Sequence, residues 1–216
     1  MYVKYETVIF DLDGTLLNTL EDLANSTNYA LEMNGYPKRT LEEVRNFVGN
    51  GYKKLIQRAL SHDVEESVYE KVLHDFKKYY EAHCNDHTAA YKGVPELLKE
   101  LSQSGYQMAI VSNKGDAGVK TLNQLYFSEY IPVAIGETSG IRKKPAPDTV
   151  LEAMRILKAN PDTTVYVGDS QVDIETARNA KIPCISVDWG FRDREFLQEN
   201  GADIIVSTTE ELLKEL

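Results

Sequence analysis

Cysteine is scarce in this chain, with two among its 216 residues. Cys84 and Cys184 lie far apart, and they match neither the spacing of a metal site nor that of a redox-active pair. Cys184 stands in the apolar run of residues 182–187, where a small buried hydrophobic residue is expected. The cysteines therefore point to neither metal binding nor redox chemistry.

Long apolar runs and an excess of positive charge are also lacking. No apolar stretch approaches the roughly 20 residues that span a bilayer, and residues 1–6 contain no apolar core of a signal peptide. Lys and Arg number 24 against 34 Asp and Glu, a net charge of −10, which disfavours nucleic acid and anionic membranes as partners. We therefore expect a cytoplasmic protein, monomeric or homodimeric, that binds a small molecule. An anionic ligand would need positive charge concentrated locally.

Short β-rich apolar runs alternate with helical stretches, the pattern of a parallel sheet in an α/β fold. The predicted strands are residues 7–10, 107–111, 132–135, 164–167, 184–187 and 203–206. The predicted helices are residues 94–103, 117–125, 148–158, 171–180 and 192–200. We expect a Rossmann-like parallel sheet flanked by helices.

A helical insertion interrupts this pattern after the first strand. Leucine and alanine recur at helical spacing from Leu20 to Leu31, and Thr40 with Glu43 forms a capping box for a further helix. The sequence therefore predicts an α/β core of residues 1–18 and 86–216, with a small α-helical cap at residues 19–85.

Two carboxylates, Asp11 and Asp13, follow the first predicted strand directly. Ligands of open α/β sheets collect at the carboxyl ends of the strands, and acids placed so close together are costly to leave uncompensated. Asp-Gly is also common in turns, so this segment alone leaves a structural role open.

Polar segments follow two further predicted strands. Ser112 and Asn113 offer a hydroxyl, an amide and backbone N–H groups at an expected helix start, which suits a phosphate as well as a simple helix cap. Lys143 and Lys144 precede Pro145, and because proline restricts the residue before it, Lys144 should project from a stiff segment. One of these lysines could supply the local positive charge, although loop lysines are more often solvated.

The segment Gly168-Asp169-Ser170 follows the fourth predicted strand, and Asp173 lies one turn into the next helix. Four-residue spacing places Asp169 and Asp173 on one side of the helix, where they can address a single ion. Oxygen ligands without histidine or thiolate suit Mg²⁺. Helix capping by Asp169 is the structural alternative.

Taken together, these segments resemble the motifs of the haloacid dehalogenase-like superfamily, in its phosphatase branch. The motif D-x-D-x-T is matched by Asp11, Asp13 and Thr15, the Ser/Thr motif by Ser112, the lysine motif by Lys144 (Lys143 being the weaker claimant), and G-D-x-x-x-D by Gly168, Asp169 and Asp173. The resemblance is strongest to phosphoglycolate phosphatases, through residues 48–51, 189–192 and 201–203.

The resemblance implies a nucleophile, an acid and a metal site. Asp11 is expected to attack phosphorus and form an aspartyl-phosphate, and Asp13 to act as general acid and base. Mg²⁺ would be held by Asp11, Asp169 and the backbone carbonyl of Asp13, with Asp173 and Ser170 supporting the site. A dehalogenase would not need the second acid, so Asp13 favours phosphoryl transfer.

The resemblance also implies where the substrate binds. Ser112, Asn113 and Lys144 would hold the phosphoryl oxygens. A cap loop would select the leaving group through Asn50, Gly51, Tyr52 and Lys53.

The sequence therefore predicts a Mg²⁺-dependent phosphatase acting on a small, phosphoglycolate-like monoester. Two alternatives remain: a phosphomutase of the β-phosphoglucomutase kind, and a catalytically idle ligand-binding protein on the same scaffold.

Overall fold

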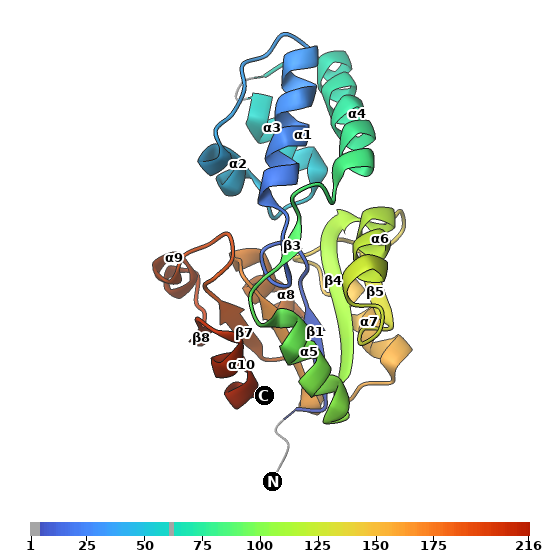
Figure 1. Ribbon diagram of the computed structural model, residues 1–216, viewed down its shortest axis with the longest axis vertical. Coiled ribbons are helices and arrows are strands. Elements are labelled where there is room, and N and C mark those ends of the chain that lie inside the picture. Colours follow the sequence, from blue (N-terminus) through green and yellow to red (C-terminus); the bar gives the residue numbers. More distant parts are fainter. Residues whose placement is uncertain (1–4, 61–62) are drawn as a thin grey trace. The chain divides into compact units, whose positions relative to one another are not determined.

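The computed structural model describes residues 5–60 and 63–216; residues 1–4 of the expected core and 61–62 of the expected insertion lie outside the described residues. The chain divides into two compact units. One contains the chain up to Leu17 and from Ala90 onward, and we call it the α/β unit; the other, Asn18–Ala89, we call the helical unit. Figure 1 labels the elements of both. No helix among the described residues combines the length and hydropathy needed to span a bilayer.

The α/β unit is built on a six-stranded sheet of order β5-β4-β1-β6-β7-β8. Every neighbouring pair of strands is parallel. The strands are β1 (Thr7–Phe10), β4 (Gln107–Gly115), β5 (Val133–Glu137), β6 (Thr164–Gly168), β7 (Cys184–Val187) and β8 (Ile204–Val206). Since the chain extends the sheet from β1 to one side and then returns to the other, ligands are expected at the carboxyl end of β1.

Strand β1 is central because its four side chains are all apolar or compact enough to be buried on both faces. It pairs with β4 on one side and β6 on the other, with Phe10 level with Ile110 and Val167. Ile9 and Tyr166 belong to the core beneath the flanking helices. This register brings the carboxyl ends of three strands to one edge.

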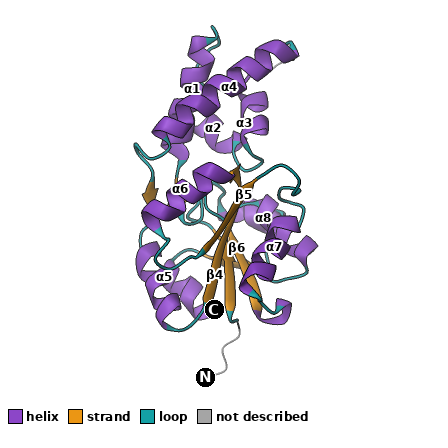
Figure 2. Ribbon diagram, turned by 90° about the vertical axis from the view of Figure 1, so that its right-hand side faces the viewer, coloured by secondary structure: helices purple, strands orange, loops and turns teal. Residues whose placement is uncertain are grey.

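Helices cover both faces of this sheet; α7 and α8 lie on one side and α5 and α6 on the other (Figure 2). Gly93, in the left-handed region, and Pro95 initiate α5, while Ser170 and Asp173 form the capping box of α8. The helices of the unit are α5 (Val94–Gln103), α6 (Asp116–Tyr126), α7 (Asp148–Leu157), α8 (Gln171–Ala180), α9 (Arg194–Glu199) and α10 (Thr209–Glu215), with a 3₁₀ turn at Pro161–Thr163.

The helical unit consists of α1 (Leu20–Met33), α2 (Leu41–Phe47), α3 (Tyr52–Leu60) and α4 (Glu66–His83). Helices α1 and α4 lie side by side (Figure 1). Phe76 and Tyr80 stack within its core, and the predicted capping box of Thr40 and Glu43 is formed. The chain enters and leaves the unit through two short paired strands, β2 (Leu17–Asn18) and β3 (Ala89–Ala90).

The Rossmann-like α/β fold is confirmed, but the end of one strand and the start of one helix differ from the prediction, and one helix was missed. Strand β4 runs to Gly115, because its polar end still pairs with β5 across a register shift after Val111. The expected loop of residues 49–53 ends at Gly51, which has a positive φ, and Tyr52 begins α3. Helix α10 was not predicted, although Thr208 caps it by accepting from the backbone N–H of Glu211.

Candidate active site

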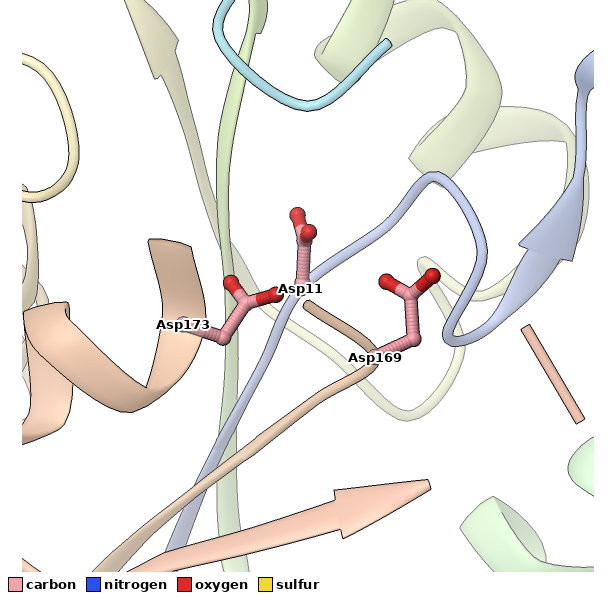
Figure 3. Close-up of side chains that lie close together, drawn as sticks. All are labelled: Asp11, Asp169 and Asp173. Atoms are coloured by element: carbon pink, nitrogen blue, oxygen red, sulfur yellow. The ribbon is translucent and has the colours of Figure 1, made fainter. Parts of the chain in front are cut away.

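Three buried aspartates meet at the carboxyl edge of the sheet. Asp11 follows β1, Asp169 follows β6, and Asp173 lies in the first turn of α8 (Figure 3). Each offers a carboxylate oxygen, and these oxygens all lie within 4.8 Å of one another. Such a group of acids cannot be fully charged without a cation nearby.

Glycines allow these carboxylates to approach. A Cβ on Gly14 or Gly190 would overlap the carboxyl group of Asp169, and a Cβ on Gly168 would overlap Asp173. Gly14 also has a φ of +88°, which favours glycine. The turn after β1 and the loop after β7 can therefore pack directly against the side chain of Asp169.

Lys144 is the cation of this cluster. Its Nζ lies 2.9 Å from Asp11 Oδ1 and 2.7 Å from Asp173 Oδ1, and its side chain is 2% exposed. It also donates to the hydroxyl of Tyr166 at 3.0 Å. Lys143 lies instead 3.7 Å from Glu137 and is partly exposed. Of the two lysines that the sequence left open, the structure brings Lys144 to the acids.

Burial dominates the electrostatics of the cluster. It raises the pKa of Asp11 well above its ordinary value, against the opposing effect of Lys144. Burial, and then the charge of Asp173, raise the pKa of Asp169 to about 7. Burial lowers the pKa of Lys144, but its carboxylate partners outweigh this effect and leave that pKa above the ordinary value. One lysine thus leaves negative charge in excess.

The three aspartates differ in how their oxygens are used. Asp173 accepts from Lys144 and Tyr166 on Oδ1, and from the backbone and hydroxyl of Ser170 on Oδ2. Asp169 accepts the backbone N–H of Phe191 at 2.7 Å, a contact that the sequence analysis did not anticipate. A hard divalent cation such as Mg²⁺ fits this all-oxygen set. Both oxygens of Asp173 already accept hydrogen bonds from the protein, which leaves Asp11 and Asp169 as the candidates for direct contact with such a cation.

Ser112 and Asn113 are buried within β4 rather than at a helix start, since α6 begins at Asp116. The hydroxyl of Ser112 accepts the backbone N–H of Lys114. The Asn113 amide donates to the carbonyl oxygen of Lys144 at 3.0 Å. This bond ties the end of β4 to the loop that carries the lysine.

The carboxylate of Asp13 is not part of the acid cluster, which Asp11, Asp169 and Asp173 form among the described residues. It lies 2.7 Å from the Nζ of Lys114, whose side chain is 0% exposed. Lys114 was not among the site residues predicted from the sequence. A lysine directly after Ser112-Asn113, on a strand that is otherwise buried, was the available signal.

The four residues of the expected cap loop belong to the helical unit. Asn50 accepts from Arg58 at 3.0 Å, and the ring of Tyr52 packs edge-on against Phe76 and Tyr80 at 5.2 and 5.7 Å between centroids. Gly51 precedes α3, and Lys53 is exposed in its first turn. Asn50 and the ring of Tyr52 therefore make contacts within the unit, and Lys53 presents its side chain to solvent.

Comparison with known proteins agrees with this geometry. The family model of haloacid dehalogenase-like hydrolases matches residues 8–187. A phosphoglycolate phosphatase of Vibrio parahaemolyticus is 33% identical over 96% of this chain and 94% of its own. A Lactobacillus delbrueckii subsp. bulgaricus structure, provisionally named a phosphoglycolate phosphatase, is 40% identical over 98% of both chains with a TM-score of 0.93.

A further solved structure is that of CbbY from Rhodobacter sphaeroides in complex with phosphate. It is 26% identical over 96% of both chains, with a TM-score of 0.79. Since the family model spans most of the chain and the relatives align along nearly all of it, the chain belongs to the haloacid dehalogenase-like hydrolases and, among these enzymes, resembles the phosphoglycolate phosphatases.

Proposed function

We propose that this hydrolase is a Mg²⁺-dependent phosphatase that cleaves a small phosphate monoester, phosphoglycolate or a close analogue, through an aspartyl-phosphate. The observation that carries the proposal is the contact of Asp11 with Lys144 inside a buried acid cluster at the carboxyl edge of the sheet. The proposed nucleophile, the lysine that balances its charge and the proposed cation ligands therefore lie in one site.

Asp11 is the proposed nucleophile. Its Oδ1 accepts the backbone N–H of Leu12 at 2.7 Å and also binds Lys144, so the carboxylate is held in one orientation. Attack on phosphorus forms an acyl-phosphate and breaks the ester P–O bond. Lys144, Ser112 and Asn113 hold the phosphoryl oxygens while charge redistributes on them.

Asp13 supplies and recovers the proton. In the first half-reaction it protonates the departing alkoxide. In the second it takes a proton from the water that attacks the aspartyl-phosphate, which releases inorganic phosphate and restores the Asp11 carboxylate.

A magnesium ion would be held by Asp11, Asp169 and the backbone carbonyl of Asp13, with Asp173 and Ser170 supporting its ligands. When bound, the ion would lessen the repulsion between the anionic nucleophile and an anionic phosphate. The raised pKa values of Asp11 and Asp169 support this site, because a cation bound between them would favour the charged form of both carboxyl groups.

The names of the relatives support the choice of substrate. Phosphoglycolate phosphatases align along nearly the whole chain, and CbbY was solved with phosphate. We propose that the helical unit is the substrate-selecting cap, with Lys53 meeting the leaving group, and that residues 1–18 and 86–216 form the catalytic core.

A turnover screen tests the proposal. Phosphoglycolate, sugar phosphates, nucleotides and pyrophosphate are each incubated with the enzyme, with Mg²⁺ or after thorough chelation, and phosphate release is measured. We expect release from phosphoglycolate that depends on Mg²⁺. Undiminished turnover after chelation would rule out the metal site. Interconversion of sugar phosphates without phosphate release would select the mutase, and no turnover of any ester would select the idle protein.

A further inference from the structure

Lys114 is a buried lysine outside the acid cluster. It lies near the end of β4, its side chain is 0% exposed, and its Nζ is 2.7 Å from Asp13 Oδ1. Lysine is almost never fully buried unless it is paired, and a hydrogen bond between two charged groups is among the stronger ones. The pair joins the turn after β1 to the end of β4, two segments that are distant in sequence and whose strands are adjacent in the sheet.

The backbone and the side chain of Asp13 are held by different groups. Its backbone lies in the tight turn after β1, where it bridges to Leu17 and is followed by Gly14 with positive φ. The carboxylate is 19% exposed and has several staggered orientations in principle. A cation at 2.7 Å selects one of them and fixes where the second carboxylate oxygen points.

The two buried lysines therefore serve different acids. Lys144 contacts Asp11 and Asp173, whereas Lys114 contacts Asp13. We propose that Lys114 is the positioning residue of the general acid: it holds the carboxyl of Asp13 where it can reach the leaving-group oxygen. This inference rests on the proposed function, and it assigns Lys114 no contact with the phosphoryl group.

Leaving-group dependence tests this role. An acid matters most for a basic alkoxide and little for nitrophenolate, which departs without a proton. We measure kcat/KM, which reports formation of the aspartyl-phosphate and not its hydrolysis, for esters from p-nitrophenyl phosphate to phosphoglycolate. Lys114→Met should lose about 10- to 100-fold on phosphoglycolate and less than about threefold on p-nitrophenyl phosphate.

Asp13→Asn is the reference for this pattern and should lose about 10²- to 10⁴-fold on phosphoglycolate. The double variant Asp13→Asn/Lys114→Met should be no worse than Asp13→Asn alone, because the lysine acts through the acid. Lys120→Met is the control, because it removes an exposed lysine that is 2.7 Å from Asp116. It should leave kcat/KM unchanged for both esters. If Lys114→Met does not fold, Lys114→Gln is measured in the same way.

The outcomes separate this inference from the proposed function. Equal losses on all esters for Lys114→Met, or losses that add to those of Asp13→Asn, would overturn the positioning role while leaving the acid assignment intact. An Asp13→Asn variant without any leaving-group dependence would overturn the acid assignment itself, and the positioning role with it.

Discussion

At the scale of single residues, the four aspartates of the candidate site have different hydrogen-bond partners, although their side chains are chemically identical. Asp173 is saturated by Lys144, Tyr166 and Ser170, and Asp13 is held by Lys114 outside the cluster. Asp11 contacts the ammonium of Lys144 through Oδ1. Four residues of one type thus differ in their hydrogen-bond partners, and the separate roles proposed for them rest on that difference.

Asp11→Asn should reduce turnover more than about a thousandfold, the scale of losing a covalent nucleophile. The amide is a poor nucleophile, so no phosphoryl-enzyme should form. Rapid-quench trapping of labelled phosphate on the protein measures this directly. Asp13→Asn is the matched control, since it retains the nucleophile. Near-normal activity of Asp11→Asn would contradict the assignment.

Asp169 predicts a dependence of stability on pH. Its folded-state pKa of about 7 lies above the value of about 3.9 expected in the unfolded chain. The folded protein therefore binds the proton more tightly, and the free energy of unfolding falls as pH rises from about 4 to about 7. The raised pKa of Asp11 acts in the same direction.

Denaturant titration of the metal-free protein between pH 5 and pH 8 checks this expectation. Mg²⁺ should restore stability at pH 8, because the ion takes the place of the proton. Asp169→Asn should flatten the pH dependence, since the amide does not titrate. A wild-type stability that does not change between pH 5 and pH 8 would contradict the buried-carboxyl argument.

At the scale of elements, strand β4 carries three consecutive buried polar side chains near its carboxyl end. Its first part, Met108–Val111, is buried and apolar, and it anchors the strand in the sheet. Within the register shift with β5, which lies between Val111 and Gly115, the same strand carries the hydroxyl of Ser112, the amide of Asn113 and the ammonium of Lys114. Irregular pairing of this kind re-aims side chains without ending the strand.

The loop after β7 should be intolerant of any side chain at Gly190. A Cβ there would overlap the carbonyl of Gly14 and the carboxyl of Asp169. We expect Gly190→Ala to weaken Mg²⁺ activation and to cost about 1–3 kcal/mol of stability. Gly105→Ala, with positive φ but open space around its Cβ, should cost stability alone. Calorimetry and Mg²⁺ titration of activity distinguish the two, and equal Mg²⁺ activation in both variants would contradict the prediction.

At the scale of the whole molecule, the candidate active-site residues and the expected cap-loop residues fall in different units. The acid cluster, Lys114 and Lys144 all belong to the α/β unit, whereas the residues of the expected cap loop belong to the helical unit. Contacts to a leaving group contribute through orientation and exclusion of water. The phosphoryl group is common to all substrates, so selectivity should depend on the helical unit.

Lys53→Met and Tyr52→Phe should therefore change the ranking of esters by about three- to tenfold in kcat/KM, a difference of about 1 kcal/mol. Tyr52→Phe keeps the ring that packs on Phe76 and Tyr80, so the unit should stay folded. Lys77→Met, exposed on α4, is the control. Uniform losses across all esters, with their ranking unchanged, would reject these residues as the selectors.

The sequence by itself determined the apolar strands of the six-stranded sheet and the polar motif residues that follow them. Continuous apolar runs such as residues 7–10 can be satisfied only inside a sheet covered on both faces, and the motif residues follow such runs directly. Thr40 and Glu43, which lie within one turn, also form the capping box that their spacing predicts. Short-range spacing is enough where the partners share one element.

Tertiary structure alone decided the pairings between elements. The contact of Lys144 and not Lys143 with Asp11, the departure of the Asp13 carboxylate from the cluster, and its pairing with Lys114 all depend on strand order and register. The polar end of β4 is a strand because β5 pairs with it across the register shift, and no apolar pattern announces it. Lys114 and Asp13, about a hundred residues apart in sequence, come into contact because β1 lies beside β4 in the sheet. Residue spacing along the chain does not specify this strand order.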